Sequence, residues 1–149
     1  MLRVALSVQP PEGFAQHFKQ SGFTDPWEPL LSRKLDDQVQ IGVVLREAHC
    51  NSRGFAHGGF LASLADNAMG LSIGTALQAS GRTPGSLVTT NLSVDYIGIA
   101  QVGEWIATNT TVLKAGNNLC VASCTVGTDA GVVARANATF LNRSLNRSV

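Results

Sequence analysis

Asp66 is the residue of this sequence that most directly suggests chemistry. It is the only charged residue between Gly58 and Ala79, a run rich in alanine, leucine and methionine that predicts one buried helix. Moving a carboxylate out of water costs several kcal/mol unless it is paired or hydrogen-bonded, so a carboxylate in such a helix is often functional. A cap on a neighbouring loop or an ion pair with an arginine remains an alternative explanation.

The predicted start of the helix has a second feature that could take part in chemistry. His57-Gly58-Gly59 places small residues where the first free amides of the helix point outward. The helix dipole favours negative charge at that end, which suits the oxyanion formed when a carbonyl is attacked. A simple tight turn into the helix would also explain two adjacent glycines.

The spacing of these residues predicts a site shared between subunits. Gly58, Ala62 and Asp66 are four residues apart and lie along one stripe of the helix. The rise of ~1.5 Å per residue separates Gly58 from Asp66 by roughly 12 Å, too far for both to act on one carbonyl. Two antiparallel copies could bring them together, and the scarcity of charges between Gly58 and Ala134 also indicates a covered surface.

The elements around the helix read as strands. Asp37–Glu47 alternates apolar and polar residues, and Trp27–Lys34 is a shorter candidate joined to it by the turn Leu35-Asp36-Asp37. Four strands follow the helix: Leu87–Ile97, Glu104–Lys114, Asn118–Val126 and Val132–Leu141. In the first of these four, Val88, Leu92, Val94 and Tyr96 are predicted on one face and Thr89 on the other. We therefore predict an α+β domain, an antiparallel sheet wrapped around one long helix.

The length of 149 residues suits one domain. We place the domain at residues 25–141. Residues 1–24 are predicted to form a loose arm with at most one short helix near Gly13–Gln20, in which His17 is a surface residue. Residues 142–149 are predicted to be a tail.

The composition excludes several classes of partner. The net charge is +1, charged residues make up 14% and hydrophobic residues 44%, so neither nucleic acid nor an anionic membrane is an expected partner. Val4-Ala5-Leu6 is too short for a signal peptide, and no apolar run is long enough to span a membrane. We expect a cytoplasmic protein in which Cys120 and Cys124 are buried thiols.

Two other chemistries are weighed and disfavoured. His49, Cys50 and His57 could suggest zinc, but no second pair of ligands exists, so we expect no metal. Cys50 as a nucleophile would need a neighbouring base, and only the adjacent His49 is available.

The stretch His49–Gly70 resembles hotdog-fold acyl-CoA thioesterases of the phenylacetate-degradation (PaaI-like) type, within the 4-hydroxybenzoyl-CoA thioesterase superfamily. Their approximate pattern, H-x-N-x-x-G-x-x-H-G-G-x-x-x-x-L-x-D, is met without insertion. The matching residues are His49, Asn51, Gly54, His57, Gly58, Gly59, Leu64 and Asp66.

This resemblance implies a hotdog fold, a homodimer that is often paired into a homotetramer, and hydrolysis of acyl-CoA without a cofactor other than the coenzyme A of the substrate. Asp66 would be the base or nucleophile, and the Gly58 amide of the partner chain would polarise the thioester carbonyl. Asn51 would position the thioester or water, His57 would shape the loop, and Thr89 would orient the water.

The coenzyme A contacts are less well specified. Many members carry Arg or Lys after the glycine of the hairpin, whereas Gly116 is followed here by Asn117 and Asn118. We expect contacts from a set of candidates: Gly59, Arg82, Lys114, Gly116, Asn117 and Asn118. A non-catalytic acyl-CoA-binding module and a hotdog dehydratase remain alternative functions.

Overall fold

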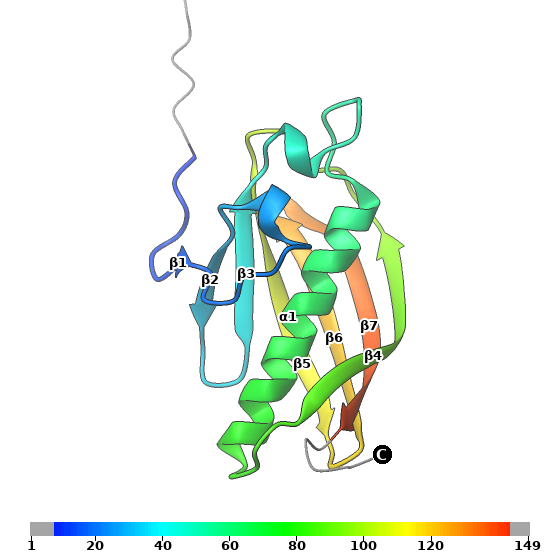
Figure 1. Cartoon of the computed structure of the whole chain (residues 1–149). Coiled ribbons are helices and arrows are strands. Elements are labelled where there is room, and N and C mark those ends of the chain that lie inside the picture. Colours follow the sequence, from blue (N-terminus) through cyan, green and yellow to red (C-terminus); the bar gives the residue numbers. More distant parts are fainter. Residues whose placement is uncertain (1–7, 144–149) are drawn as a thin grey trace, which may run out of the picture.

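One long helix lies across the concave face of a curved sheet (Figure 1). The computed structural model describes residues 8–143. The helix is α1 (Gly58–Ala79), and two short 3-10 helices precede it, η1 (Asp25–Trp27) and η2 (Glu47–His49). The strands are β1 (Ala15–Gln16), β2 (Leu31–Lys34), β3 (Val39–Val44), β4 (Ser86–Tyr96), β5 (Trp105–Ala115), β6 (Leu119–Thr128) and β7 (Gly131–Arg143).

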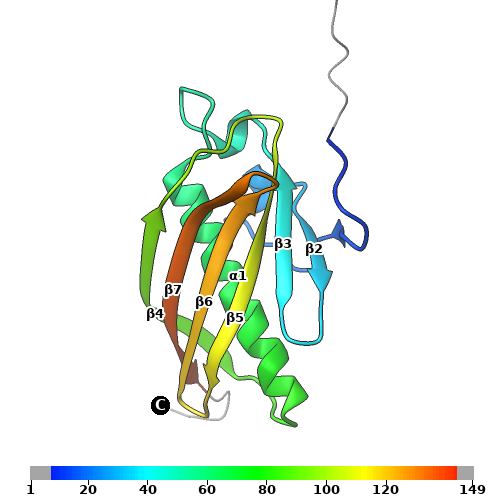
Figure 2. The ribbon, with the colours of Figure 1, turned by 180° about the vertical axis from the view of Figure 1, so that it is seen from behind.

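The strands form one antiparallel sheet in the order β1-β2-β3-β5-β6-β7-β4. Seen from behind, the face of the sheet opposite α1 carries no helix among the described residues (Figure 2). The predicted α+β architecture of one helix and an antiparallel sheet is confirmed, with each of the predicted strands present close to its expected position.

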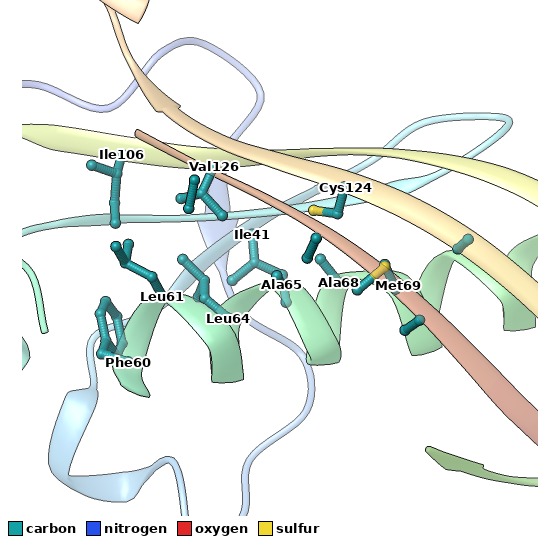
Figure 3. Packing of buried hydrophobic residues seen from close by; sticks show 14 of the residues in the cluster. Ile41, Phe60, Leu61, Leu64, Ala65, Ala68, Met69, Ile106, Cys124 and Val126 are labelled. Carbon is teal, nitrogen blue, oxygen red and sulfur yellow. The ribbon is translucent and has the colours of Figure 1, made fainter. Parts of the chain in front are cut away.

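The core forms between the buried face of α1 and the inner face of the sheet (Figure 3). Each large apolar side chain buried here stabilises the fold by ~1.5–3 kcal/mol. The helix contributes Phe60, Leu61, Leu64, Ala65, Ala68, Met69, Ile73 and Leu77. The inner residues of β6 and β7 are mostly small, which lets the helix lie close to the sheet: Cys120, Ala122, Cys124, Ala134, Ala136 and Ala138. The prediction that Cys120 and Cys124 are buried free thiols is confirmed.

The prediction that α1 is buried nearly all round is wrong for one of its faces. That face is only half-buried in the single chain, and its residues recur at helical spacing. The half-exposed face consists of Ala62, Ser63, Asp66, Asn67, Gly70, Leu71, Gly74 and Thr75. Because small residues such as alanine and serine occur on both faces of the helix, the sequence did not separate this face from the core face.

The N-terminal arm contributes one short strand to the sheet, Ala15–Gln16, and the short helix predicted near Gly13–Gln20 is wrong. Residues 15–16 form β1, which pairs with β2, and the ring of Phe14 meets Trp105 edge-on at 4.9 Å. The prediction that His17 lies on the surface is also wrong, since the residue is 6% exposed. Pairing with a sheet edge and packing against the core override local propensity here.

The predicted tail, residues 142–149, lies partly inside and partly outside the described residues. Asn142 and Arg143 belong to β7, which continues pairing with β4 as far as Ser86. Residues 144–149 of that tail and residues 1–7 of the arm lie outside the described residues.

Candidate active site

Asp66 has one specific partner. Its Oδ1 accepts a hydrogen bond from Thr89 Oγ1 at 2.7 Å. Thr89 lies on β4, the edge strand beside the half-exposed face of α1 (Figure 1). The carboxylate Oδ2 has no hydrogen-bond partner among residues 8–143. This oxygen could therefore accept a proton from a water molecule or attack an electrophilic carbon itself.

A bulge in β4 turns Thr89 toward the helix. The pairing of β4 with β7 shifts register at Thr90, which is an extra residue in the strand. Leu87 before the bulge and Leu92 after it both pack against the core, so Thr89 shares the inner face with Leu87. The predicted faces are therefore wrong for the first half of the strand, and Val88 is on the outer face with 43% exposure.

The start of α1 presents a free amide. His57 is the N-cap, and its Nδ1 accepts the amide hydrogen of Gly59 at 2.9 Å. The Gly58 amide has no hydrogen-bond partner among the described residues, as expected for the first turn of a helix. This amide and the helix dipole could together stabilise a negatively charged oxygen.

Tyr96 is a residue of this region that sequence analysis missed. Its hydroxyl donates a hydrogen bond to the Gly58 carbonyl oxygen at 2.7 Å. Its ring lies 3.1 Å from the position that a Cβ on Gly58 would occupy, so glycine lets β4 approach the helix end. Tyr96 was predicted to share a strand face with Leu92 and Val94, and it is 55% exposed. No pattern in the sequence indicates its hydrogen bond.

Asn51 organises the loop that leads into the helix. Its Oδ1 accepts the amide hydrogens of Arg53 at 2.9 Å and Phe55 at 3.2 Å. The side-chain oxygen is thus used within the loop, and the side-chain Nδ2 remains as the donor that a ligand could meet.

His49 anchors this loop to the core. Its Nδ1 accepts the Arg46 amide hydrogen at 3.0 Å, and its Nε2 donates to the Trp27 carbonyl at 2.8 Å. The ring stacks on Phe60 with centroids 4.7 Å apart. Burial lowers the pKa of His49 despite the opposing effect of the Trp27 hydrogen bond, so the ring is a neutral structural element.

A groove of about 780 Å³ runs along the half-exposed face of α1 and includes Asp66. The start of β4, with Thr89, lines one side, and the N-terminal arm, with His17 and Phe18, lines the other. Gly70 and Gly74 lie between them, and a Cβ added at Gly74 would meet no atom within 4 Å. Small residues on the helix therefore leave space for a ligand next to the carboxylate.

The proposed catalytic residues form two separate groups in one chain. Asp66 and Thr89 lie beside the middle of α1, whereas Gly58 is at its start together with His57. Gly58 and Asp66 belong to one uninterrupted helix, so the separation of roughly 12 Å expected from helix geometry applies. One chain alone does not place the free amide and the carboxylate around one carbonyl.

The candidate coenzyme A contacts also form two groups. Arg82 donates to Asn117 Oδ1 at 3.3 Å, and Lys114 lies 3.2 Å from the Cβ position of Gly116. These residues and Asn118 gather where α1 ends and β5 turns into β6 (Figure 1). Gly59, in contrast, is at the opposite end of the helix.

The alternative chemistries gain no support from the site. Burial, with a contribution from Glu47, raises the pKa of the Cys50 thiol, which disfavours the nucleophilic thiolate. Within residues 8–143, no three His, Cys, Asp or Glu side chains are grouped as a metal site would require. Over the same range, no helix is both long and apolar enough to cross a membrane.

Comparison with known proteins identifies relatives over most of the chain. The family model described as thioesterase superfamily matches residues 53–135. A Pseudomonas aeruginosa protein named as an esterase is 39% identical over 132 residues, which cover 87% of this chain and 95% of that protein. Acyl-coenzyme A thioesterase 13 of Mus musculus is 33% identical over 109 residues, covering 71% and 73% of the two chains.

Solved structures share the fold. Zebra fish thioesterase superfamily member 2 superposes with a TM-score of 0.73 at 23% identity, covering 83% of this chain and 88% of that chain. A mutant of the phenylacetic acid degradation protein PaaI from Thermus thermophilus superposes with a TM-score of 0.66 at 23% identity, covering 76% of this chain and 93% of that chain. A thioesterase protein of Streptococcus pneumoniae, solved with coenzyme A, superposes with a TM-score of 0.69 at 22% identity, covering 79% of this chain and 91% of that chain. At these identities the likeness shows the fold alone.

Proposed function

The chain belongs to the thioesterase superfamily and is a thioester hydrolase, and from this premise we propose that it is of the PaaI-like type and hydrolyses acyl-CoA or aryl-CoA thioesters to the free acid and coenzyme A. The name of the mouse relative and the coenzyme A bound to the streptococcal structure support this substrate class. The observation that carries the proposal is the Asp66 carboxylate, hydrogen-bonded to Thr89 in a groove beside an otherwise uncharged helix.

We propose that the complete site forms between two copies of the chain. In an antiparallel pair of helices, the start of one α1 meets the middle of the other, which places the Gly58 amide of one copy near Asp66 of its partner. The half-exposed face of α1 and the unpaired edge of β4 are the surfaces available for such contact. The apolar residues exposed along and just after β4 support this arrangement: Val88, Tyr96, Ile97 and Ile99.

In the reaction that we propose, the thioester oxygen accepts a hydrogen bond from the Gly58 amide, and Asn51 of the same copy donates to the thioester or the water. If Asp66 is a base, it takes a proton from water as the water oxygen bonds to the carbonyl carbon. The carbon–sulfur bond then breaks, and the coenzyme A thiolate takes up the proton. If Asp66 is a nucleophile, its oxygen bonds to the carbon, the carbon–sulfur bond breaks and coenzyme A leaves as the thiolate. Water then hydrolyses the resulting anhydride to the free acid and the Asp66 carboxylate, and the proton released is taken up by the thiolate.

The remaining residues of the proposal position these groups. Thr89 fixes the orientation of Asp66 and can hold the attacking water, and His57 shapes the loop and caps the helix. Arg82 and Lys114, with Gly116, Asn117 and Asn118, would contact coenzyme A, and Gly59 would lie at its thioester end. The chemistry needs no cofactor other than the coenzyme A of the substrate.

Substitution of Asp66 tests the proposal. We expect Asp66→Asn and Asp66→Ala to reduce thiol release from a panel of acyl-CoA substrates by at least ~10²-fold, because the reaction loses the carboxylate that acts as base or nucleophile. Asp95→Asn is the matched control, since Asp95 pairs with Arg135 in an exposed ion pair away from the groove. Undiminished thiol release by folded Asp66 variants would contradict the proposal.

A further inference from the structure

His17 is a buried histidine whose side chain has no hydrogen-bond partner in the described part of the chain. The residue is 6% exposed, its Nδ1 is shielded from solvent, and no hydrogen bond reaches either ring nitrogen from residues 8–143. Its backbone is fixed, because its amide donates to the Leu30 carbonyl at 2.9 Å. A buried polar group costs free energy when it is left unpaired, so an unpaired imidazole at a fixed position needs an explanation.

The other buried histidine shows the ordinary arrangement. His49 is 1% exposed, and both of its ring nitrogens have backbone partners. Within residues 8–143, one buried imidazole is therefore fully hydrogen-bonded and the other has no hydrogen-bond partner. The difference is that His17 borders the groove that contains Asp66, and His49 does not.

The groove wall around His17 is suited to oxygen atoms. Lys19 and Lys34 line the same side of the groove, and Lys34 Nζ lies 4.0 Å from the centre of the Phe18 ring. Glu28, whose charge also acts on His17, accepts the Leu30 amide hydrogen through Oε2 at 2.7 Å, and its Oε1 is buried without a hydrogen-bond partner among the described residues. Glu28 does not line the groove. The groove thus presents a carboxylate on α1 and hydrogen-bond donors on the opposite wall.

We infer that His17 determines substrate specificity by hydrogen-bonding an oxygen substituent on the acyl group, so that the groove selects acyl groups with a hydroxyl or carboxylate over the plain hydrocarbon. This inference rests on the proposed function, in which the groove beside Asp66 receives the acyl group. A neutral imidazole can donate to either substituent and can also accept from a hydroxyl. The lysines would favour a carboxylate further.

Binding of non-hydrolysable analogues tests the inference without requiring turnover. The probes are S-alkyl-CoA thioethers of matched chain length, plain, hydroxylated or carboxylated at successive carbons, with Kd measured by calorimetry. We expect the wild type to bind at least one oxygenated thioether about tenfold more tightly than its plain counterpart, because a buried site built for a hydrogen bond rejects an analogue that lacks it. Lys34→Met distinguishes the two substituents, since it should weaken only the carboxylated probe.

His17→Phe should abolish the preference and leave binding of the plain thioether within about twofold, because it keeps a ring and removes both nitrogens. His17→Gln should keep part of the preference, and it provides a second variant if phenylalanine disturbs the arm. Gln16→Ala, which changes the exposed neighbour outside the groove, should behave as the wild type.

Three results would overturn the inference. The first is equal affinity of the wild type for plain and oxygenated probes, and the second is a preference for oxygenated probes that survives His17→Phe. The third is that His17→Phe and His17→Gln each weaken the plain and the oxygenated probe to the same extent. Failure of the proposed function is distinguishable, because a chain that shows the His17-dependent preference but releases no thiol from any acyl-CoA would retain the inference and lose the hydrolase proposal.

Discussion

The hydrogen bond between Thr89 and Asp66 is the single side-chain contact in the described structure that holds the candidate catalytic carboxylate. A hydroxyl that donates to a carboxylate fixes the orientation of both oxygens, and hydrogen bonds to charged groups are worth ~1.5–3 kcal/mol. Thr89 therefore matters for the position of the carboxylate, whereas its exposed location makes it unimportant for the core.

Thr89→Val, which keeps the side-chain shape and removes the hydroxyl, should lower kcat by about tenfold to hundredfold with a smaller change in KM. The melting temperature should change little. Thr90→Val is the matched control, because the Thr90 hydroxyl bonds to Thr139 rather than to Asp66. Equal effects of the two substitutions on kcat would contradict a specific role for Thr89.

Histidine burial predicts loss of stability in mild acid. Burial lowers the pKa of His49 and of His17 below the ordinary 6.5, so the unfolded chain takes up protons that the folded chain does not. Stability is therefore full above pH 6.5 and falls as the pH drops below it, by at most ~1.4 kcal/mol per pH unit for each histidine. Urea unfolding measured between about pH 7.5 and about pH 5 should show this fall, and a smaller one in His49→Gln. An unchanged slope in that variant would count against the prediction.

At the scale of elements, the bulge in β4 decides which residues of the strand reach the groove. If Thr90 were paired regularly instead of bulging, Thr89 would share a face with Asn91 rather than with Leu92. The bulge thus lets Thr89 and Leu92 both face inward although two residues separate them.

Deletion of Thr90 should remove this irregularity. We expect thiol release to fall less than in Thr89→Val, because Leu87, Thr89 and Leu92 still alternate onto the inner face once the extra residue is gone. Thr90→Gly, which retains the residue count, should keep most of the activity. Circular dichroism checks that the sheet persists, and a folded deletion variant as impaired as Thr89→Val would contradict this expectation and show that the bulge itself is required.

At the scale of the whole molecule, one chain leaves a long strand edge and an apolar surface open. Within residues 8–143, β4 pairs only with β7, and Ile97 and Ile99 are 59% and 64% exposed. Unpaired strand edges and exposed apolar patches are ordinarily covered in soluble proteins. Covering both with a second copy would also unite the two groups of candidate catalytic residues.

Mixing two inactive variants tests the shared site directly. Asn51→Ala and Asp66→Asn should each be nearly inactive alone. In a mixed dimer, Asp66 of the first variant faces Asn51 and Gly58 of the second, so random mixing after refolding should restore about a quarter of wild-type activity. A mixture with no more activity than its components would contradict the shared site. A stable monomer of wild-type activity in sedimentation experiments would contradict it as well.

The sequence by itself determined the elements and the residues with chemical character. The run from Gly58 to Ala79 specified α1, because its composition favours a helix and Pro84-Gly85 prevents its continuation. The alternation of small apolar residues specified β6 and β7, and the isolated charge of Asp66 marked it as the candidate acid. These features depend on local periodicity and on the cost of burying a charge, which can be read along the chain.

Only the tertiary structure decided which residues face the groove. Thr89 turns inward because of the pairing between β4 and β7, and Tyr96 reaches Gly58 across the fold. His17 is buried where β1, which ends just before it, pairs with β2. Each of these contacts joins residues separated in the sequence, and none leaves a local pattern. Register, bulges and burial against distant elements are properties of the packed sheet, so they become visible only when the sheet has formed.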